Sequence, residues 1–201
     1  MRTAEGIRVT KGKPTAPTLR SVGAMSDEDV KAATDATRTL PDEAIRRRII
    51  DLGFGGDAER FRQFVDAIRK AIPLPVTVVL RGSAVTGVKW ADGSPFDAEG
   101  PGSSDLDLTF VGSEMLKLFE EFYIPGLHSV PLSDDAPGAA PALTPLRRAL
   151  SAIAGRPVNI QATSSLVQYA RDVLLDQPYF TLLEGDAATH GEGGEGATAD
   201  P

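Results

Sequence analysis

The sequence predicts an α/β (α+β) domain in which helices flank a small mixed β-sheet. Segments with apolar residues at helical spacing alternate with short apolar runs rich in valine, isoleucine and leucine. Proline and glycine lie at the junctions between most of these segments. Such alternation is typical of a layered domain whose sheet is covered by helices. We expect this domain to span residues 26–183.

The composition excludes several classes of protein. The chain has 201 residues and no cysteine, so disulfides and thiolate metal sites are ruled out and we expect a cytoplasmic protein. No run of about 18 apolar residues is present. The N-terminus lacks the apolar segment of a secretory signal, and we expect no membrane partner. Neither a P-loop nor a Rossmann glycine fingerprint occurs.

The two ends of the chain differ in composition from the expected domain. Residues 1–25 lack apolar periodicity, and we expect a flexible N-terminal arm. Residues 184–201 are expected to form an acidic, glycine-rich disordered tail. Five acids and no Lys or Arg lie in this tail, so the rest of the chain carries only −2 of the total charge of −7. A domain this close to neutral gives little general attraction to nucleic acid.

Spacing and end signals predict the individual elements. A first helix is expected to begin near residue 26, and further helices are expected over 42–53, 57–72, 113–123, 142–154 and 164–175. The expected strands cover 76–80, 106–111, 157–162 and 178–183, with a loop over 124–141. Two of these helices are expected to turn particular residues inward, namely Met115, Leu116, Phe119 and Phe122 in one and Leu166, Val167, Ala170 and Val173 in the other.

Two acids mark the second strand. Side chains alternate along a strand, so Asp105 and Asp107 project to one side while Leu106 and Leu108 project to the other. Two carboxylates this close repel each other, and burial raises the cost of ionising both. A divalent cation removes both problems, and oxygen ligands suit Mg²⁺ or Mn²⁺. An edge strand with one side facing water explains the same pattern without a metal.

The first strand ends in an Arg-Gly-Ser turn. Gly82 allows the backbone to approach a ligand closely, and Ser83 adds a hydroxyl donor at the start of an expected helix. Such a turn alone is often ordinary turn chemistry, whereas a turn followed by an acid pair indicates phosphate and metal together. Arg81 beside the turn either pairs with a phosphate or is an exposed charge at the strand end.

The segments VVLRGSAVTG and SSDLDLTFVG together resemble the polymerase-β-like nucleotidyltransferase superfamily. Its members carry an apolar strand, Gly-Ser, a short helix and then a strand with Asp-x-Asp. Here the gap between the two motifs is lengthened by VKWADGSPFDAEGPG. The resemblance covers about residues 60–183 and is strongest over 78–112.

This resemblance implies a nucleotidyltransferase-like fold and a function. The family moves a nucleotide from a nucleoside triphosphate such as ATP to an acceptor hydroxyl and releases pyrophosphate. It implies that Gly82 and Ser83, with Arg81 beside them, bind the phosphates. It also implies that Asp105 and Asp107 hold Mg²⁺ or Mn²⁺, which neutralises charge on the transferring and leaving groups.

The sequence departs from the family at the third carboxylate. By order and pattern, that acid corresponds to Asn159 in the strand RPVNIQA, and an amide cannot accept a proton at neutral pH. Three explanations remain: a slow transferase, a nucleotide-binding pseudoenzyme that serves as a regulatory module, or an enzyme whose third acid comes from elsewhere. Asp92, Asp97 and Glu99 in the inserted loop are candidates for that acid.

Other polar residues give weaker signals. His128 lies in a segment rich in proline and glycine and lacks metal-ligand spacing. Lys89 and Trp90 are candidates for contact with the phosphate and the base, but a lone tryptophan is more often a packing residue, and Trp90 is interpreted as one. Arg147 and Arg148 are interpreted as a solvated helix face. The sequence leaves the acceptor open among a small molecule, RNA and a protein. The small size suggests that a second copy or a partner protein completes the site.

Overall fold

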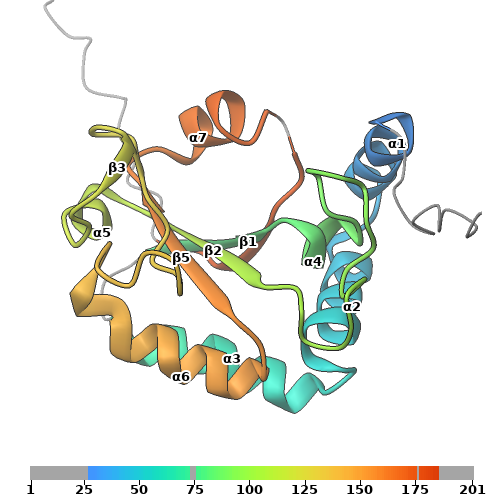
Figure 1. Ribbon diagram of the computed structural model, residues 1–201, viewed down its shortest axis with the longest axis horizontal. Coiled ribbons are helices and arrows are strands. Elements are labelled where there is room, and N and C mark those ends of the chain that lie inside the picture. The colour runs from blue at the N-terminus through green and yellow to red at the C-terminus, as the bar shows by residue number, and fades with distance from the viewer. Residues whose placement is uncertain (1–26, 73–75, 176, 186–201) are drawn as a thin grey trace, which may run out of the picture.

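The computed structural model describes residues 27–72, 76–175 and 177–185 as an α+β domain around one mixed sheet (Figure 1). The expected N-terminal arm and residues 186–201 of the expected tail lie outside the described residues. Within the described ranges, none of the helices has the length and apolar character needed to cross a membrane. The predicted fold class is confirmed.

Six strands form the sheet in the order β3-β4-β5-β2-β1-β6. β2 and β5 run parallel, and the other neighbouring pairs run antiparallel. The strands are β1 (Thr77–Arg81), β2 (Leu106–Val111), β3 (Phe122–Ile124), β4 (His128–Ser129), β5 (Val158–Thr163) and β6 (Phe180–Leu183). All four predicted strands are therefore present, with β3 and β4 added at one edge.

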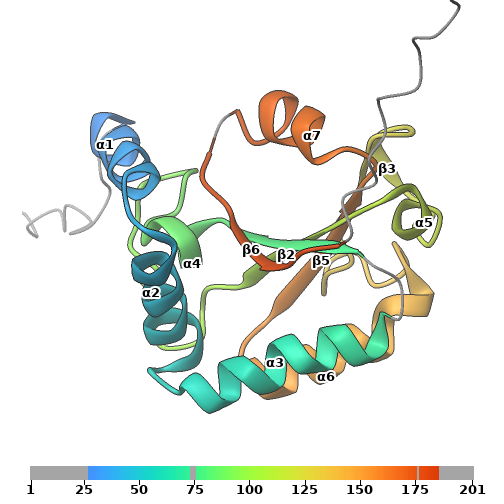
Figure 2. The same ribbon diagram turned by 180° about the vertical axis from the view of Figure 1, so that it is seen from behind.

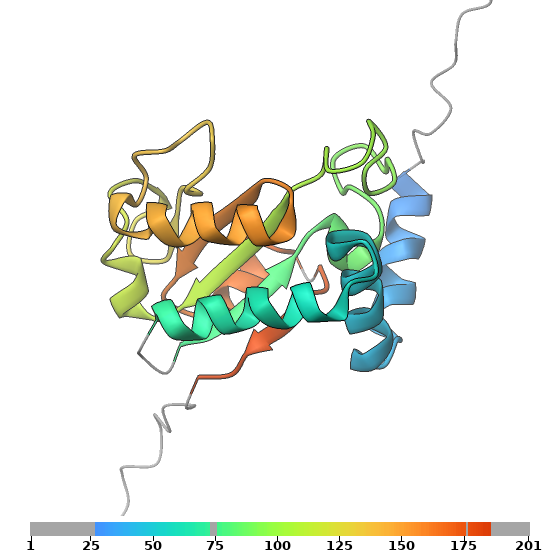
Figure 3. The same ribbon diagram turned by 90° about the horizontal axis from the view of Figure 1, so that it is seen from below.

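One face of the sheet forms the apolar core. Leu80, Leu108 and Ile160 are neighbours in register on β1, β2 and β5, and all three are buried. Helices α3 (Ala58–Ala71) and α6 (Thr144–Ala154) lie side by side against this face (Figures 2 and 3). Each fully buried aliphatic side chain stabilises the fold by about 1.5–3 kcal/mol.

The opposite face of the sheet is polar and is spanned by helix α7 (Leu166–Asp172) (Figure 1). Val167, predicted to point inward, is 77% exposed, whereas Tyr169 is fully buried. The Tyr169 hydroxyl accepts a hydrogen bond from Thr109 and donates one to Gln161, at 3.1 and 3.5 Å. The prediction was therefore wrong for Val167, because α7 covers a polar surface that accommodates the amphipathic Tyr169. Leu166, Ala170 and Val173, also predicted to point inward, are half-buried.

Helices α1 (Asp27–Arg38), α2 (Asp42–Phe54) and α4 (Ser83–Thr86) gather at one side of the sheet (Figure 1). α2 does not end at Gly53 as predicted but continues to Phe54, and it is capped by Gly55, which has a left-handed φ of 64°. Position 53 lies inside the helix, and a Cβ there would come within 3.2 Å of the Leu106 side chain. This glycine allows α2 to approach β2 closely.

The predicted helix over 113–123 is wrong in its second half. α5 covers only Ser113–Leu116, and Phe122–Ile124 form β3, which pairs with β4 inside the segment predicted to be a loop. Phe122 is exposed rather than buried. Its aromatic and β-branched neighbours favour a strand, and the Pro125-Gly126 turn lets that strand fold back on β4.

Arg147 was predicted to be solvated, and this prediction was also wrong. Its side chain is buried, its Nε donates to the Val158 carbonyl over 2.7 Å, and its Nη2 lies 2.8 Å from an Asp134 carboxylate oxygen. Arg147 thereby ties α6 to the start of β5. Arg148 is exposed, as predicted.

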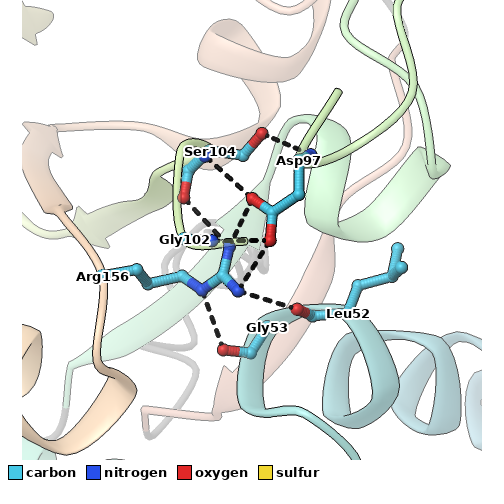
Figure 4. Close-up of polar contacts among 6 residues, drawn as sticks. All are labelled: Leu52, Gly53, Asp97, Gly102, Ser104 and Arg156. Carbon is cyan, nitrogen blue, oxygen red and sulfur yellow. Dashed lines mark hydrogen bonds and ion pairs between the residues drawn. The ribbon is translucent and has the colours of Figure 1, made fainter. Parts of the chain in front are cut away.

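Arg156 connects three distant segments (Figure 4). Its Nε donates to the Gly53 carbonyl over 3.0 Å and its Nη2 to the Leu52 carbonyl over 3.1 Å, both at the end of α2. Two further hydrogen bonds of 2.9 and 3.1 Å reach the two carboxylate oxygens of Asp97, and another reaches the Ser104 carbonyl. The side chain is only 8% exposed, so this ion pair is largely desolvated.

Asp97 organises the inserted loop around the Arg156 guanidinium. Its carboxylate also accepts the backbone N–H groups of Gly102 and Ser104, each over 2.9 Å. Burial alone would raise the pKa of Asp97, but the hydrogen bonds from Arg156, Gly102 and Ser104 outweigh it and hold that pKa below its ordinary value. The residue that follows Ser104 is Asp105, so this cluster fixes the backbone directly before the acidic strand.

Replacing Arg156 should destabilise the domain strongly. We expect Arg156→Ala to cost about 3–5 kcal/mol of unfolding free energy, because the half-buried Asp97 would lose its cation and three backbone carbonyls would lose their donor. Urea unfolding at neutral pH measures the change. Arg148→Ala, on the exposed face of α6, should stay within about 0.5 kcal/mol of the wild type.

The loss should also depend on pH. A carboxylate with a lowered pKa contributes stability above its ordinary pKa, and this contribution is lost as the pH falls through the folded-state value. The gap between Arg156→Ala and the wild type should therefore narrow in acid. Equal unfolding midpoints at neutral pH would contradict this account of Arg156.

Candidate functional site

Three adjacent strands bring the predicted site residues together on the polar face. Arg81 on β1 is the register partner of Asp107 on β2, and Asp107 is the register partner of Asn159 on β5. Side chains in one register row lie on the same face of a sheet. Asp105 precedes β2 by one residue and shares the face of Asp107. The residue predicted to replace the third acid is thus a direct neighbour of the acid pair.

The Asn159 amide bridges the two carboxylates. Its Nδ2 donates to Oδ2 of Asp105 and, over 3.1 Å, to Oδ1 of Asp107. On the other side, Nη1 of Arg81 lies 3.7 Å from Oδ2 of Asp107. The side chains of Arg81 and Asp107 each keep about a fifth of their surface exposed, so the cluster is half-buried.

The acid pair raises the pKa of one member. Burial and then the charge of Asp107 raise the pKa of the Asp105 carboxyl above its ordinary value, although the Asn159 amide opposes the shift. Burial works against the charge of Arg81, but Asp107 keeps the pKa of this guanidinium above its ordinary value. Two carboxylates facing one guanidinium leave the ionised cluster with one excess negative charge.

This excess negative charge fits a divalent cation that receives further ligands from a bound phosphate. In the described residues, no group of three or more His, Cys, Asp or Glu side chains is placed to hold a metal. Asp105 and Asp107 provide two carboxylates, and Asn159 would provide an oxygen if its amide turned over. Mg²⁺ is commonly held by one or two carboxylates together with the phosphates of a substrate. The residues therefore fit a cation that arrives with a phosphorylated ligand.

The inserted loop does not supply the third acid. Asp92 accepts hydrogen bonds from the backbone and side chain of Ser94. Asp97 is bound to Arg156. Glu99 is 79% exposed and faces Lys89 at 4.0 Å. Within the described part of the loop, none of these three acids forms a hydrogen bond or ion pair with the cluster.

The Gly-Ser turn lies directly against the acid pair. Gly82 has a φ of 79°, and a Cβ at this position would come within 2.9 Å of Oδ2 of Asp107. Glycine is required here both by the backbone conformation and by the space. Arg48 on α2 donates to the Val85 carbonyl over 2.8 Å and so holds α4 in place behind the turn.

A cavity of about 400 Å³ begins at Arg81 and Gly82 and extends between the polar face and α7. Its further lining includes His128, Gln161 and Tyr169. The Arg81 Nη2 donates to the Gln161 Oε1, so Arg81 connects the cavity with the acid cluster, where it forms an ion pair with Asp107. Trp90, interpreted from the sequence as a packing residue, is 54% exposed and also lines the cavity.

Sequence reasoning missed three residues of this cavity. Gln161 lies two residues after Asn159, so strand periodicity was a signal for it. Tyr169 was the one aromatic residue in its helix. His128 carried no signal, because β4 is only two residues long and lies in a segment that reads as a loop. The structure buries His128 to 3% exposure, and burial lowers the pKa of its imidazole to about 4.

Comparison of the chain with protein-family models, with curated proteins and with solved structures finds no match.

Removing the Asp105 charge should stabilise the protein when no metal is bound. We expect Asp105→Asn to raise the melting temperature by a few degrees at pH 7, about the effect of 1 kcal/mol in a domain of this size. The new amide keeps an oxygen to accept from Asn159 and no longer repels Asp107. Thermal unfolding in a chelating buffer measures the shift, with the exposed Asp135→Asn as a control that should change nothing.

The stability gained by Asp105→Asn should depend on pH. A carboxyl with a raised pKa favours the folded state only below its ordinary pKa, and this contribution is lost as the pH rises through the folded-state value. The advantage of Asp105→Asn should therefore shrink as the buffer is made acidic. A variant less stable than the wild type at pH 7 would show that the acid pair is not a source of repulsion.

Proposed function

We propose that this protein is a metal-dependent nucleotidyltransferase of the polymerase-β-like kind. In this function it moves a nucleotide from a nucleoside triphosphate to an acceptor hydroxyl and releases pyrophosphate. The bond between the α-phosphorus and the acceptor oxygen forms while the bond to the pyrophosphate oxygen breaks. The proton of the acceptor hydroxyl passes to a base or to solvent.

One observation carries the proposal: the Gly-Ser turn touches the acid pair. Gly82 leaves no room for a side chain beside Asp107, and Asp105 shares Asn159 with Asp107. Phosphates bound at Gly82 and Ser83 would therefore lie next to the two carboxylates. Motifs separated by more than twenty residues in the sequence meet at one point of the polar face.

The proposed roles follow from these positions. Asp105 and Asp107 would hold Mg²⁺ or Mn²⁺, which would neutralise charge on the transferring and leaving phosphates. Arg81 adds a fixed positive charge beside Gly82. Asn159 orients both carboxylates but cannot take the proton of the acceptor. The acceptor would be a small molecule, an RNA or a protein. A second copy or a partner would complete its site, and the cytoplasm is the proposed compartment.

Asn159 also supports a second candidate, a nucleotide-binding module that regulates a partner without catalysis. The amide satisfies both carboxylates, and the described inserted loop brings no acid to replace it. This arrangement keeps a place for phosphates and a cation but contains no evident base. The two candidates agree on binding and differ in turnover.

Binding should require nucleotide and metal together. We expect a nucleoside triphosphate with Mg²⁺ or Mn²⁺ to raise the melting temperature, and either component alone to give little change. A ligand at one hundred times its dissociation constant stabilises the native state by about 2.7 kcal/mol. Thermal unfolding with each of four triphosphates, with and without metal, measures this effect.

Variants identify the site of that binding. Asp105→Asn and Asp107→Asn should abolish the combined shift while the proteins stay folded, and Asp135→Asn should keep it. The absence of a shift with every combination of triphosphate and metal would contradict both candidate functions. An undiminished shift in Asp105→Asn or Asp107→Asn would move the binding site away from the acid pair.

Restoring the third carboxylate should separate the two candidates. We expect Asn159→Asp to lower the melting temperature without metal, because a third negative charge replaces the bridging amide. If the protein is a transferase that lacks one acid, the variant should release pyrophosphate at least about tenfold faster with a suitable acceptor, as an added general base would. Pyrophosphate release measures this rate. No release from either protein, with binding intact, would favour the regulatory module.

A further inference from the structure

We propose that the cavity beneath α7 holds the heterocyclic base of the nucleotide, with His128 bonding its edge. The identity of the ligand as a nucleotide rests on the proposed function, whereas the cavity is defined by its own lining residues. Its volume of about 400 Å³ lies in the range of small-molecule sites.

The cavity is continuous with the phosphate turn. Arg81 and Gly82 belong to the acid cluster and also line the cavity. One molecule can therefore place phosphates against Gly82 and a second part beneath α7. A nucleotide has this shape, because its base and its phosphates lie at opposite ends of the sugar.

Unpaired polar atoms point to a ligand that forms hydrogen bonds. The Nδ1 of His128 and the Nε of Arg81 are buried and have no hydrogen-bond partner among the described residues. His128 is 97% buried, and leaving such a group unpaired costs free energy that a ligand can recover. Its imidazole is neutral at pH 7, because burial and the charge of Arg81 lower its pKa to about 4. A neutral imidazole nitrogen suits the uncharged edge of a base.

Aromatic rings provide faces on which a flat ring can stack. The ring centroid of His128 lies 4.9 Å from that of Tyr169 and 5.7 Å from that of Tyr123. Tyr123 and Trp90 are exposed at the cavity, so their faces are accessible. Bases stack on such side chains with about 1–3 kcal/mol per base. The one acid among the lining residues, Asp172, is paired with Arg171.

The test uses free nucleosides, which have a base but no phosphate. Trp90 is the only tryptophan of the chain and lines the cavity, so its fluorescence reports occupancy. We expect at least one of adenosine, guanosine, cytidine and uridine to give a saturable change in a chelating buffer. His128→Phe keeps a ring but removes Nδ1, and should weaken that binding about tenfold or more.

Further variants keep the test decisive. If His128→Phe does not fold, Tyr123→Ala removes an exposed ring and should weaken nucleoside binding about fivefold or more. Val167→Ala, on the outer side of α7, should leave the affinity unchanged.

The outcomes distinguish the cavity from the proposed function. Nucleoside binding that depends on the His128 or Tyr123 side chain, without any shift from triphosphate and metal, supports the cavity and contradicts the proposed function. A metal-dependent triphosphate shift without nucleoside binding overturns the assignment of the cavity and leaves the proposed function intact. Nucleoside binding that is unchanged in folded His128→Phe or, if that variant does not fold, in Tyr123→Ala also overturns the assignment.

Discussion

Arg156 holds together the part of the fold from which the candidate site projects. Its guanidinium binds the last turn of α2, the carboxylate of Asp97 in the inserted loop and the carbonyl before Asp105 (Figure 4). Cζ of Arg156 also lies 4.6 Å from the centroid of the Phe96 ring, which covers the ion pair. A buried charge of this kind is tolerated only when all its partners are present. The loop therefore has one well-defined path into β2, and the acid pair has a fixed starting point.

The two faces of the sheet divide stability and chemistry. The face under α3 and α6 buries aliphatic side chains and provides most of the apolar burial. The face under α7 carries ionised and hydrogen-bonding groups in alternate register rows, first Arg81 with Asp107 and Asn159, then Thr109 with Gln161. The alternation of β2 places apolar and acidic residues on opposite sides of one strand. A one-residue change of register would exchange them, so the core and the site enforce the same pairing.

The sequence predicts the sheet strands β1, β2, β5 and β6, because periodicity is a local signal. That Asn159 lies beside the acid pair was implied only by the family resemblance, which places a third carboxylate at that position. It does not predict β3 and β4, since their pairing depends on the edge of β5 rather than on their own spacing. The burial of Tyr169 on α7 was missed for a related reason: its hydroxyl bonds to Thr109 and Gln161, and no aliphatic stripe in the helix indicates this. The burial of His128 and the ion pairs of Asp97 and Arg147 depend on contacts between distant segments, which no local pattern encodes.

The charges of the cluster explain why the proposed ligands would bind as a pair. A cation alone would find two carboxylates and an amide, which is fewer ligands than Mg²⁺ takes, so water would fill the remaining positions. A triphosphate alone would add negative charge at Gly82, which lies against Asp107, and Arg81 is the cation of the described cluster that would oppose the repulsion. Together, the cation neutralises the repulsion and the phosphates complete its coordination. Each ligand thus supplies what the site lacks for the other, and this makes joint binding the distinguishing property of the proposed site.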